Sequence, residues 1–269
     1  KVKHTNLKVM AKRGRPRKVN SVTKKTLKEL NLVQMNQIEF DPSLFTPMKT
    51  NTIVDTILST EGGLFPGTNT VVIGDPGVGK STVLLDMLAS LKRQGKKVLF
   101  ISGEMNEIDL HGYVKRFPKF GDIPILFLQH YDGCVQEAIE SVLDEGYDCV
   151  MVDSWAEVND SFAEENNCTK KKAESWLLDL MDQHNKAKNK LDKHTAFIVI
   201  QQMSKSGDFI GSNRIKHMTT AMAHMKFDGR GRDAERYMIF SKNRRGDVGE
   251  KIYFSLFRPN NVEYSFEMV

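Results

Sequence analysis

Gly74-Asp75-Pro76-Gly77-Val78-Gly79-Lys80-Ser81-Thr82 is the stretch of sequence that decides the fold. Four residues separate two of its glycines, Gly74 and Gly79, and a lysine and a serine follow directly. Glycines let backbone N–H groups face phosphates, the lysine can neutralise the β- and γ-phosphates, and the serine hydroxyl can bind Mg²⁺. The spacing predicts a phosphate-binding loop (P-loop) for ATP with Mg²⁺. The alternative is a chance glycine-rich turn.

The segments around this loop predict an α/β fold. An apolar strand is expected over residues 70–73 and a helix over residues 80–94, so that the helix N-terminus points at the anion. Further strands are expected at 97–102, 123–128, 149–153 and 195–201, and further helices at 135–145 and 170–188. Such alternation predicts a mainly parallel sheet flanked by helices. Strand-like segments at 221–227, 235–241 and 251–257 predict antiparallel hairpins at the C-terminal end.

Two carboxylates are expected near the loop because each follows a predicted strand. Asp153 closes the apolar run 149–153, at the sheet edge where ligands bind in parallel sheets, and there it can hold Mg²⁺. Its alternative role is a helix or turn cap. Glu104 follows the strand 97–102 and can orient the water that attacks ATP, with Glu107 and Asp109 as competitors for that role.

The positive charge of the chain is concentrated in its first thirty residues. Residues 1–30 hold eleven Lys or Arg and one acidic residue, a net +10 against +5 for the whole chain, which leaves −5 for the rest. A basic segment of this kind, with almost no apolar periodicity, predicts a flexible arm with a polyanionic partner, most often nucleic acid. We therefore expect two parts, an arm over 1–30 and an ATPase domain over 31–269.

Within the arm, residues 12–18 read Lys-Arg-Gly-Arg-Pro-Arg-Lys. Glycine permits close approach and proline keeps the backbone extended, so Arg13, Arg15 and Arg17 can enter a narrow minor groove. The motif resembles an AT-hook and predicts contact with AT-rich duplex DNA. The alternative is a non-specific basic tail.

Other classes of protein are excluded by composition. The three cysteines, Cys134, Cys149 and Cys168, are odd in number and lack a Cys-x-x-Cys pair, so neither a disulfide framework nor a cysteine zinc site is expected. No apolar run approaches the roughly 18 residues that span a bilayer, and no signal peptide is recognisable. We expect a cytoplasmic, nucleoid-associated protein, in the host cytoplasm if it is phage-encoded.

Several motifs together resemble the RecA-like ATPase superfamily, and within it the ATPase core of bacterial RadA (Sms). The matching stretches cover about residues 48–258, and the motif Lys-Asn-Arg-Arg-Gly resembles the Lys-Asn-Arg-Phe-Gly of that family, with Arg245 in place of Phe. They are 63–67, 74–82, 98–104, 150–154, 206–211, 217–218 and 242–246. The four-cysteine zinc module and the Lon-protease-like domain of RadA have no counterpart here. A compact core of this kind resembles phage-encoded recombination or replication ATPases.

The resemblance implies roles for particular residues. Glu104 would be the catalytic carboxylate and Gln202 the sensor of the γ-phosphate. Residues 204–217 would form a DNA-facing loop in which Lys205, Arg214 and Lys216 meet phosphates. Lys242 and Arg244 would reach the ATP of a neighbouring subunit, whereas without the resemblance they are more simply a solvated hairpin loop.

The leading hypothesis is a DNA-dependent ATPase of homologous recombination, branch migration or replication. It would form a homo-oligomer, a ring or a filament, on single-stranded or branched DNA, with ATP at the subunit interfaces. One alternative is the core of a DnaB-type replicative helicase. The other is a nucleotide-switched DNA-binding or loader protein that does not turn ATP over.

Overall fold

The computed structural model describes residues 33–202, 213–231, 234–256 and 261–267. Its contacts divide the chain into one unit over residues 1–40 and a second over residues 41–269. In the described part of the first unit, a single turn of 3₁₀-helix, η2 (Met35–Gln37), lies among side chains that are all exposed. The second unit contains the sheet and helices described below.

The second unit is built on a nine-stranded sheet, in the order β3-β2-β4-β5-β1-β6-β7-β8-β9. The strands from β3 to β6 run parallel, and β6 to β9 pair antiparallel. Their bounds are β1 (Asn69–Gly74), β2 (Val98–Ser102), β3 (Ile125–Phe127), β4 (Cys149–Asp153), β5 (Ala196–Gln201), β6 (Ala221–Asp228), β7 (Glu235–Asn243), β8 (Lys251–Ser255) and β9 (Glu263–Ser265).

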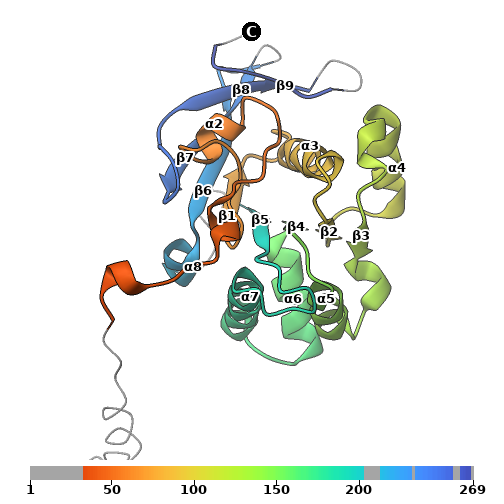
Figure 1. Ribbon diagram of the computed structural model, residues 1–269. Helices are drawn as coiled ribbons and strands as arrows, with labels where there is room; N and C mark the ends of the chain where they lie inside the picture. The colour runs from red at the N-terminus through yellow and green to blue at the C-terminus, as the bar shows by residue number, and fades with distance from the viewer. Residues whose placement is uncertain (1–32, 203–212, 232–233, 257–260, 268–269) are drawn as a thin grey trace, which may run out of the picture. The chain divides into compact units, whose positions relative to one another are not determined.

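Helices cover the sheet on both faces, as Figure 1 shows. On one face lie α2 (Asp55–Leu58), α3 (Lys80–Arg93) and α4 (Glu107–Arg116); on the other lie α5 (Val135–Asp144), α6 (Trp155–Glu165), α7 (Lys170–Asn185) and α8 (Asn213–Met218). Short 3₁₀ turns η3 (Pro42–Phe45), η4 (Pro118–Phe120) and η5 (Leu128–Tyr131) connect them.

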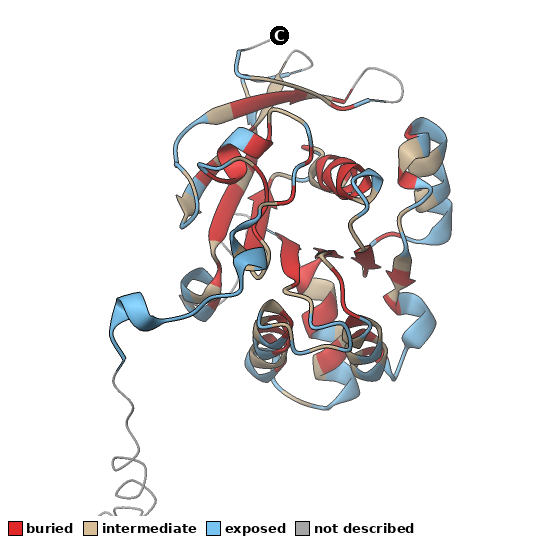
Figure 2. Cartoon of the chain, in the orientation of Figure 1, coloured by how far each residue is buried: buried red, intermediate tan, exposed pale blue. Residues whose placement is uncertain are grey.

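The core has one layer on each face of the sheet because the central strands are buried on both sides. β1, β2, β4 and β5 are buried at every position, so alternate residues enter opposite layers. α3 is buried from Thr82 to Leu91, all around its circumference, whereas α4 has no buried residue (Figure 2). The first helix after the P-loop is therefore fixed by packing, and α4 is a surface helix.

The predicted fold class is confirmed, including the parallel strands and the antiparallel C-terminal extension. Four of the described α-helices did not appear among the expected elements: α2, α4, α6 and α8. α8 changes one prediction, because residues 213–217 of the expected DNA-facing loop lie in a helix. No helix in the described ranges has the length and apolar character needed to cross a membrane.

Candidate nucleotide site

The P-loop joins the end of β1 to the start of α3. Gly79 stands at the N-cap of α3 with φ of 103°, a left-handed conformation that favours glycine, and a Cβ at this position would collide with the side chain of Leu256. Gly77 also has a positive φ, of 75°. The loop therefore needs glycine both for its backbone path and for the close approach of the C-terminal segment.

Lys80 folds back over this loop. Its Nζ donates hydrogen bonds to the carbonyl oxygens of Gly74, at 2.9 Å, and Asp75, at 3.0 Å. Burial lowers the pKa of the Lys80 ammonium, and the charges of Asp153, Glu104 and Asp75 oppose that shift. The ammonium thus lies in the anion cradle, in contact with backbone carbonyls that phosphate oxygens can replace.

Ser81 and Asp153 meet beside the lysine. The Ser81 hydroxyl donates to Asp153 Oδ2 at 2.5 Å, and Asp153, at the end of β4, is only 2% exposed. Burial raises the pKa of Asp153 to about 6, although the Ser81 hydrogen bond acts in the opposite direction. Asp153 does not cap α6, because the helix begins after Ser154 without a side-chain cap bond.

The donor set fits Mg²⁺ rather than a metal held by protein alone. A hydroxyl and a carboxylate are the hard oxygen ligands that Mg²⁺ uses, together with water and substrate phosphates. Within the described ranges, no group of three or more His, Cys, Asp or Glu side chains is placed to hold a metal ion. Ser81 and Asp153 would therefore supply only part of a Mg²⁺ shell, and a bound nucleotide would complete it.

Glu104 and Gln202 lie on the same side of the loop. Gln202 Nε2 donates to Glu104 Oε1 at 2.9 Å, although the two residues are 98 positions apart in the chain. The competitors for the catalytic role are engaged elsewhere: Glu107 pairs with His130 at 3.2 Å, and Asp109 accepts a hydrogen bond from the backbone N–H of Asn106, the N-cap residue of α4. Glu104 lines the cavity beside Lys80, and neither competitor does.

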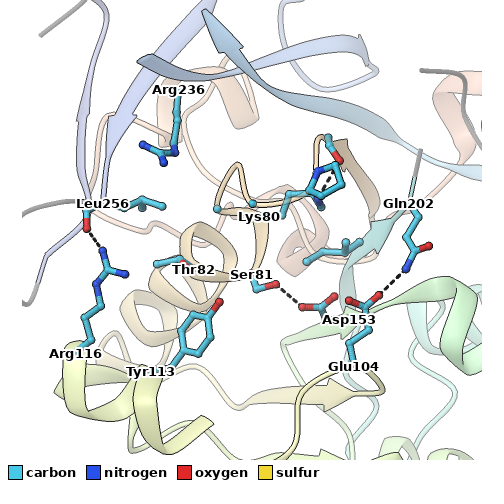
Figure 3. Close-up of a pocket in the computed structure, with 15 residues that line it drawn as sticks. Lys80, Ser81, Thr82, Glu104, Tyr113, Arg116, Asp153, Gln202, Arg236 and Leu256 are labelled. Carbon is cyan, nitrogen blue, oxygen red and sulfur yellow. Dashed lines mark hydrogen bonds between the residues drawn. The ribbon is translucent and has the colours of Figure 1, made fainter. Parts of the chain in front are cut away.

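One cavity of about 610 Å³ is lined by five of the side chains described above (Figure 3), namely Lys80, Ser81, Glu104, Asp153 and Gln202. At the opposite end of the cavity from Asp153, Glu104 and Gln202 lie residues that the sequence had not indicated. They are Tyr113 and Arg116 from α4, Arg236 from β7, and Leu256 after β8.

This second end of the cavity suits a flat, aromatic group. The backbone carbonyl of Leu256 accepts a hydrogen bond from Arg116, which links α4 to the C-terminal segment. Burial lowers the pKa of the Arg236 guanidinium, and the nearby charge of Arg116 lowers it further. Guanidinium and phenol planes stack on aromatic rings, so the geometry can hold a nucleotide base while the P-loop holds its phosphates. No sequence motif relates these residues to one another, so sequence analysis did not identify them.

The remaining predicted site residues lie away from the cavity or outside the described residues. Lys242 and Arg244 contact the last turn of α8, and Arg214 of α8 contacts α7. Lys216 lies on the same helix and is exposed. Arg13, Arg15, Arg17 and Lys205 lie outside the described residues. The structure thus brings together the ATP and Mg²⁺ residues and leaves the proposed DNA residues as predictions.

Comparison with known proteins agrees with this geometry. No family model matches the chain. Among curated proteins, the DNA repair protein RadA of Listeria monocytogenes is 30% identical over 203 residues, which are 72% of this chain and 40% of that protein. RadA of Campylobacter jejuni is 29% identical over 239 residues, 86% of this chain and 51% of that protein. The chain therefore spans about half or less of the length of these relatives.

Two solved structures share the fold at low sequence identity. A KaiC-like protein of Pyrococcus horikoshii superimposes with a TM-score of 0.58 at 16% identity, covering 82% of this chain and 99% of that one. The flagellar accessory protein FlaH of Methanocaldococcus jannaschii gives the same TM-score and coverage at 12% identity. The strand order, the P-loop and these relatives agree on one RecA-like architecture.

Proposed function

We propose, from the premise that this chain is a RecA-like P-loop protein related to RadA, that it is a DNA-dependent ATPase acting in recombination, branch migration or replication. The observation that carries the proposal is the meeting of Lys80, Ser81, Asp153, Glu104 and Gln202 at one end of a single cavity. These side chains come from four separate segments of the chain. A structural role alone gives no reason for a lysine, two acids and an amide to converge on a phosphate-sized loop.

The geometry supports hydrolysis rather than binding alone. Glu104 is placed past the end of β2, and its hydrogen bond to Gln202 fixes one carboxylate oxygen while the other remains available to orient a water. Lys80 and the P-loop N–H groups would stabilise the charge that builds on the phosphates. When bound, Mg²⁺ would neutralise the phosphate oxygens, and Ser81 and Asp153 are the residues that would hold it.

The DNA and assembly parts of the proposal draw on the RadA relatives. Those relatives are named DNA repair proteins, and Arg214 and Lys216 offer two cations on α8. We expect Lys242 and Arg244 to act on the ATP of a neighbouring subunit in a ring or filament, because neither lines the chain's own cavity. Single-stranded or branched DNA is the expected substrate.

Steady-state ATPase measurements with and without single-stranded DNA test the proposal. The protein should hydrolyse ATP only with Mg²⁺, and faster with DNA. Lys80→Ala should lose the phosphate contacts and reduce turnover by at least about a thousandfold. Asp75→Asn is the control within the loop and should have a much smaller effect, because it keeps the backbone carbonyl that Lys80 contacts and removes only a nearby charge. ATP binding without turnover, in the presence or absence of DNA, would instead favour a nucleotide-switched loader.

The basic arm over residues 1–30 forms a separate part of the proposal. Deleting residues 1–20 should lower DNA affinity and make the slope of log affinity against log salt shallower, because fewer phosphates are neutralised. ATPase at saturating DNA should remain. Replacing Arg13, Arg15 and Arg17 by Lys keeps the charge, so it should abolish only a preference for AT-rich duplex. An unchanged salt slope after the deletion would exclude phosphate contacts by the arm.

A further inference from the structure

Lys242 and Arg244 hold the C-terminal turn of α8. Lys242 Nζ donates to the carbonyl oxygens of Thr219, at 2.6 Å, and Lys216, and Arg244 Nη2 donates to that of His217 at 2.8 Å. The last carbonyls of a helix have no partner within the helix, so such donors satisfy them. Burial lowers the pKa of Lys242, and the charge of Arg244 lowers it further, so these hydrogen bonds bring the two cations together in a partly desolvated position.

These contacts compete with the role expected of the same two residues. Lys242 uses two of its three N–H donors within its own subunit, and these hydrogen bonds hold its ammonium group at the end of α8. The charge that these cations would supply to a neighbouring γ-phosphate is therefore withheld while α8 stays in place. A shift of α8 by less than one helical turn would break all three hydrogen bonds of Lys242 and Arg244, because their acceptors lie in one short segment.

The other end of α8 is held by α7. Arg214 Nη1 donates to Ser175 Oγ at 2.7 Å, and Arg214 Nη2 pairs with Asp179 Oδ1 at 2.6 Å. Ile215, next in the chain, is 1% exposed and packs in the core layer that α7 also lines. α8 is thus fixed by α7 at its start and by the end of β7 at its finish.

The Arg214–Asp179 ion pair is easily exchanged. The side chains of both partners are about half exposed, 42% for Arg214 and 58% for Asp179. Pairs in such exposed positions contribute little to stability, and a phosphate competes with a carboxylate for the same guanidinium. Arg214 is also one of the two α8 cations expected to contact DNA. A nucleic-acid phosphate that binds Arg214 would therefore remove one of the contacts between α8 and α7, the ion pair with Asp179.

We propose that Asp179 is a positioning residue that keeps α8, and through it Lys242 and Arg244, in a withheld arrangement until a nucleic-acid phosphate displaces it from Arg214. DNA then stimulates ATP hydrolysis because release of α8 frees the two cations for the neighbouring nucleotide. This inference rests on the proposed function, since it needs an ATPase whose neighbour supplies Lys242 and Arg244. It assigns to α7, which lines no part of the nucleotide cavity, a role in setting the basal rate.

The test compares Asp179→Asn with Asp182→Asn. Both remove a carboxylate charge from α7, but Asp182 pairs with Lys186, and no hydrogen bond or ion pair among the described residues joins it to α8. Asp179→Asn should raise the DNA-free ATPase rate by about two- to fivefold, the most that an exposed ion pair of this kind can supply. It should also lower the concentration of oligo-dT that gives half-maximal stimulation and leave the DNA-saturated rate unchanged. Asp182→Asn should change none of these.

Charge reversal adds a rescue. Asp179→Arg should raise the basal rate further by repelling Arg214, and the double variant Asp179→Arg/Arg214→Asp should return it toward the wild-type value. A merely structural role for the pair would lower the melting temperature and the DNA-saturated rate in parallel. Equal basal rates in Asp179→Asn and Asp182→Asn, with an active wild type, would overturn the inference.

Amide hydrogen exchange separates failure of this inference from failure of the proposed function. The amides of residues 214–220 should exchange faster in Asp179→Asn than in Asp182→Asn, and faster in the wild type with oligo-dT than without it. This readout needs no ATPase activity. Normal exchange differences in a protein without turnover would refute the proposed ATPase and keep the link between Asp179 and α8. Unchanged exchange in a DNA-stimulated ATPase would refute the link between Asp179 and α8 and keep the proposed ATPase.

Discussion

The phosphate end of the cavity and the corner between β7 and α8 were both expected to serve ATP, and they are built in opposite ways. At the phosphate end, the two acids meet other side chains, as in Ser81–Asp153 and Gln202–Glu104. At the corner, the described hydrogen bonds of the Lys242 and Arg244 side chains go to backbone carbonyls in α8 and just after it. A pocket made by side chains at the ends of buried strands is fixed before ligand binds, whereas cations that are bonded to the end of a six-residue helix can exchange their partners.

The largest expected effect tests whether the phosphate end is complete within one subunit. Glu104→Gln should bind ATP with normal affinity but hydrolyse it about 10²- to 10³-fold more slowly, because the amide cannot accept a proton from water. Glu107→Gln is the matched control, since Glu107 is an exposed carboxylate three positions along that contacts His130. Nucleotide binding by fluorescence and turnover in the same preparation give the two quantities.

Normal turnover in Glu104→Gln would remove the basis of the contrast. Activation of the water would then belong to a group outside this end of the cavity, and Glu107 and Asp109 would have to be tested next. Loss of ATP binding together with turnover would show that Glu104 holds the P-loop in shape rather than acting on water.

The same contrast explains what could be predicted from the sequence. The spacing of Gly74, Gly79, Lys80 and Ser81 is local, and Asp153 is marked by the buried strand before it, so these positions followed from short segments. The meeting of Glu104 with Gln202 follows from both standing at carboxyl ends of parallel strands. α8 could not be anticipated, because the segment 213–218 is short and mostly polar. Its own main-chain carbonyls accept the hydrogen bonds from Lys242 and Arg244, and no sequence pattern marks such acceptors. Arg116 and Arg236 reach the cavity through tertiary contacts alone.

A subunit-mixing experiment decides whether the β7–α8 corner belongs to a neighbour's site. Lys80→Ala removes a subunit's own P-loop contact, and Arg244→Ala removes the cation it would offer to the next subunit. If Arg244 acts across an interface, an equal mixture should recover activity at roughly a quarter of its interfaces, those that combine an intact P-loop with an intact Arg244 under random assembly. Steady-state ATPase across mixing ratios measures the recovery.

Mixing Lys80→Ala with Glu104→Gln is the control for this experiment. Both changes lie in the same cavity, so no interface in that mixture contains a complete site, and activity should not return. Absence of recovery in the Arg244 mixture, with mixed assembly verified by sizing, would place Lys242 and Arg244 with α8 alone. The β7–α8 corner would then have only a structural role, and it would differ from the phosphate end in function as well as in structure.

The smallest expected effect concerns the cost of building the phosphate end in advance. Burial raises the pKa of Asp153 from its usual 3.8 to about 6, so the folded, nucleotide-free protein disfavours the ionised carboxylate that Mg²⁺ requires. A raised pKa means that the folded state binds the proton more tightly than the unfolded state. Stability should therefore rise as pH falls from above 6 toward 4, and the penalty should be fully present at neutral pH.

Asp153→Asn removes the charge and should stabilise the nucleotide-free protein by about 1–3 kcal/mol at pH 7.5, and by progressively less as the pH falls from 6 toward 4. Urea unfolding across this pH range measures the difference, and Asp122→Asn, at an exposed aspartate, is the control that should leave it unchanged. With Mg²⁺ and ATP present the order should invert, because only the wild type gains the ligand's stabilisation in full. If the unfolding free energies of the wild type and Asp153→Asn change with pH in parallel, burial of the Asp153 carboxylate carries no desolvation penalty. The phosphate end would then be no more strained than the corner beside α8.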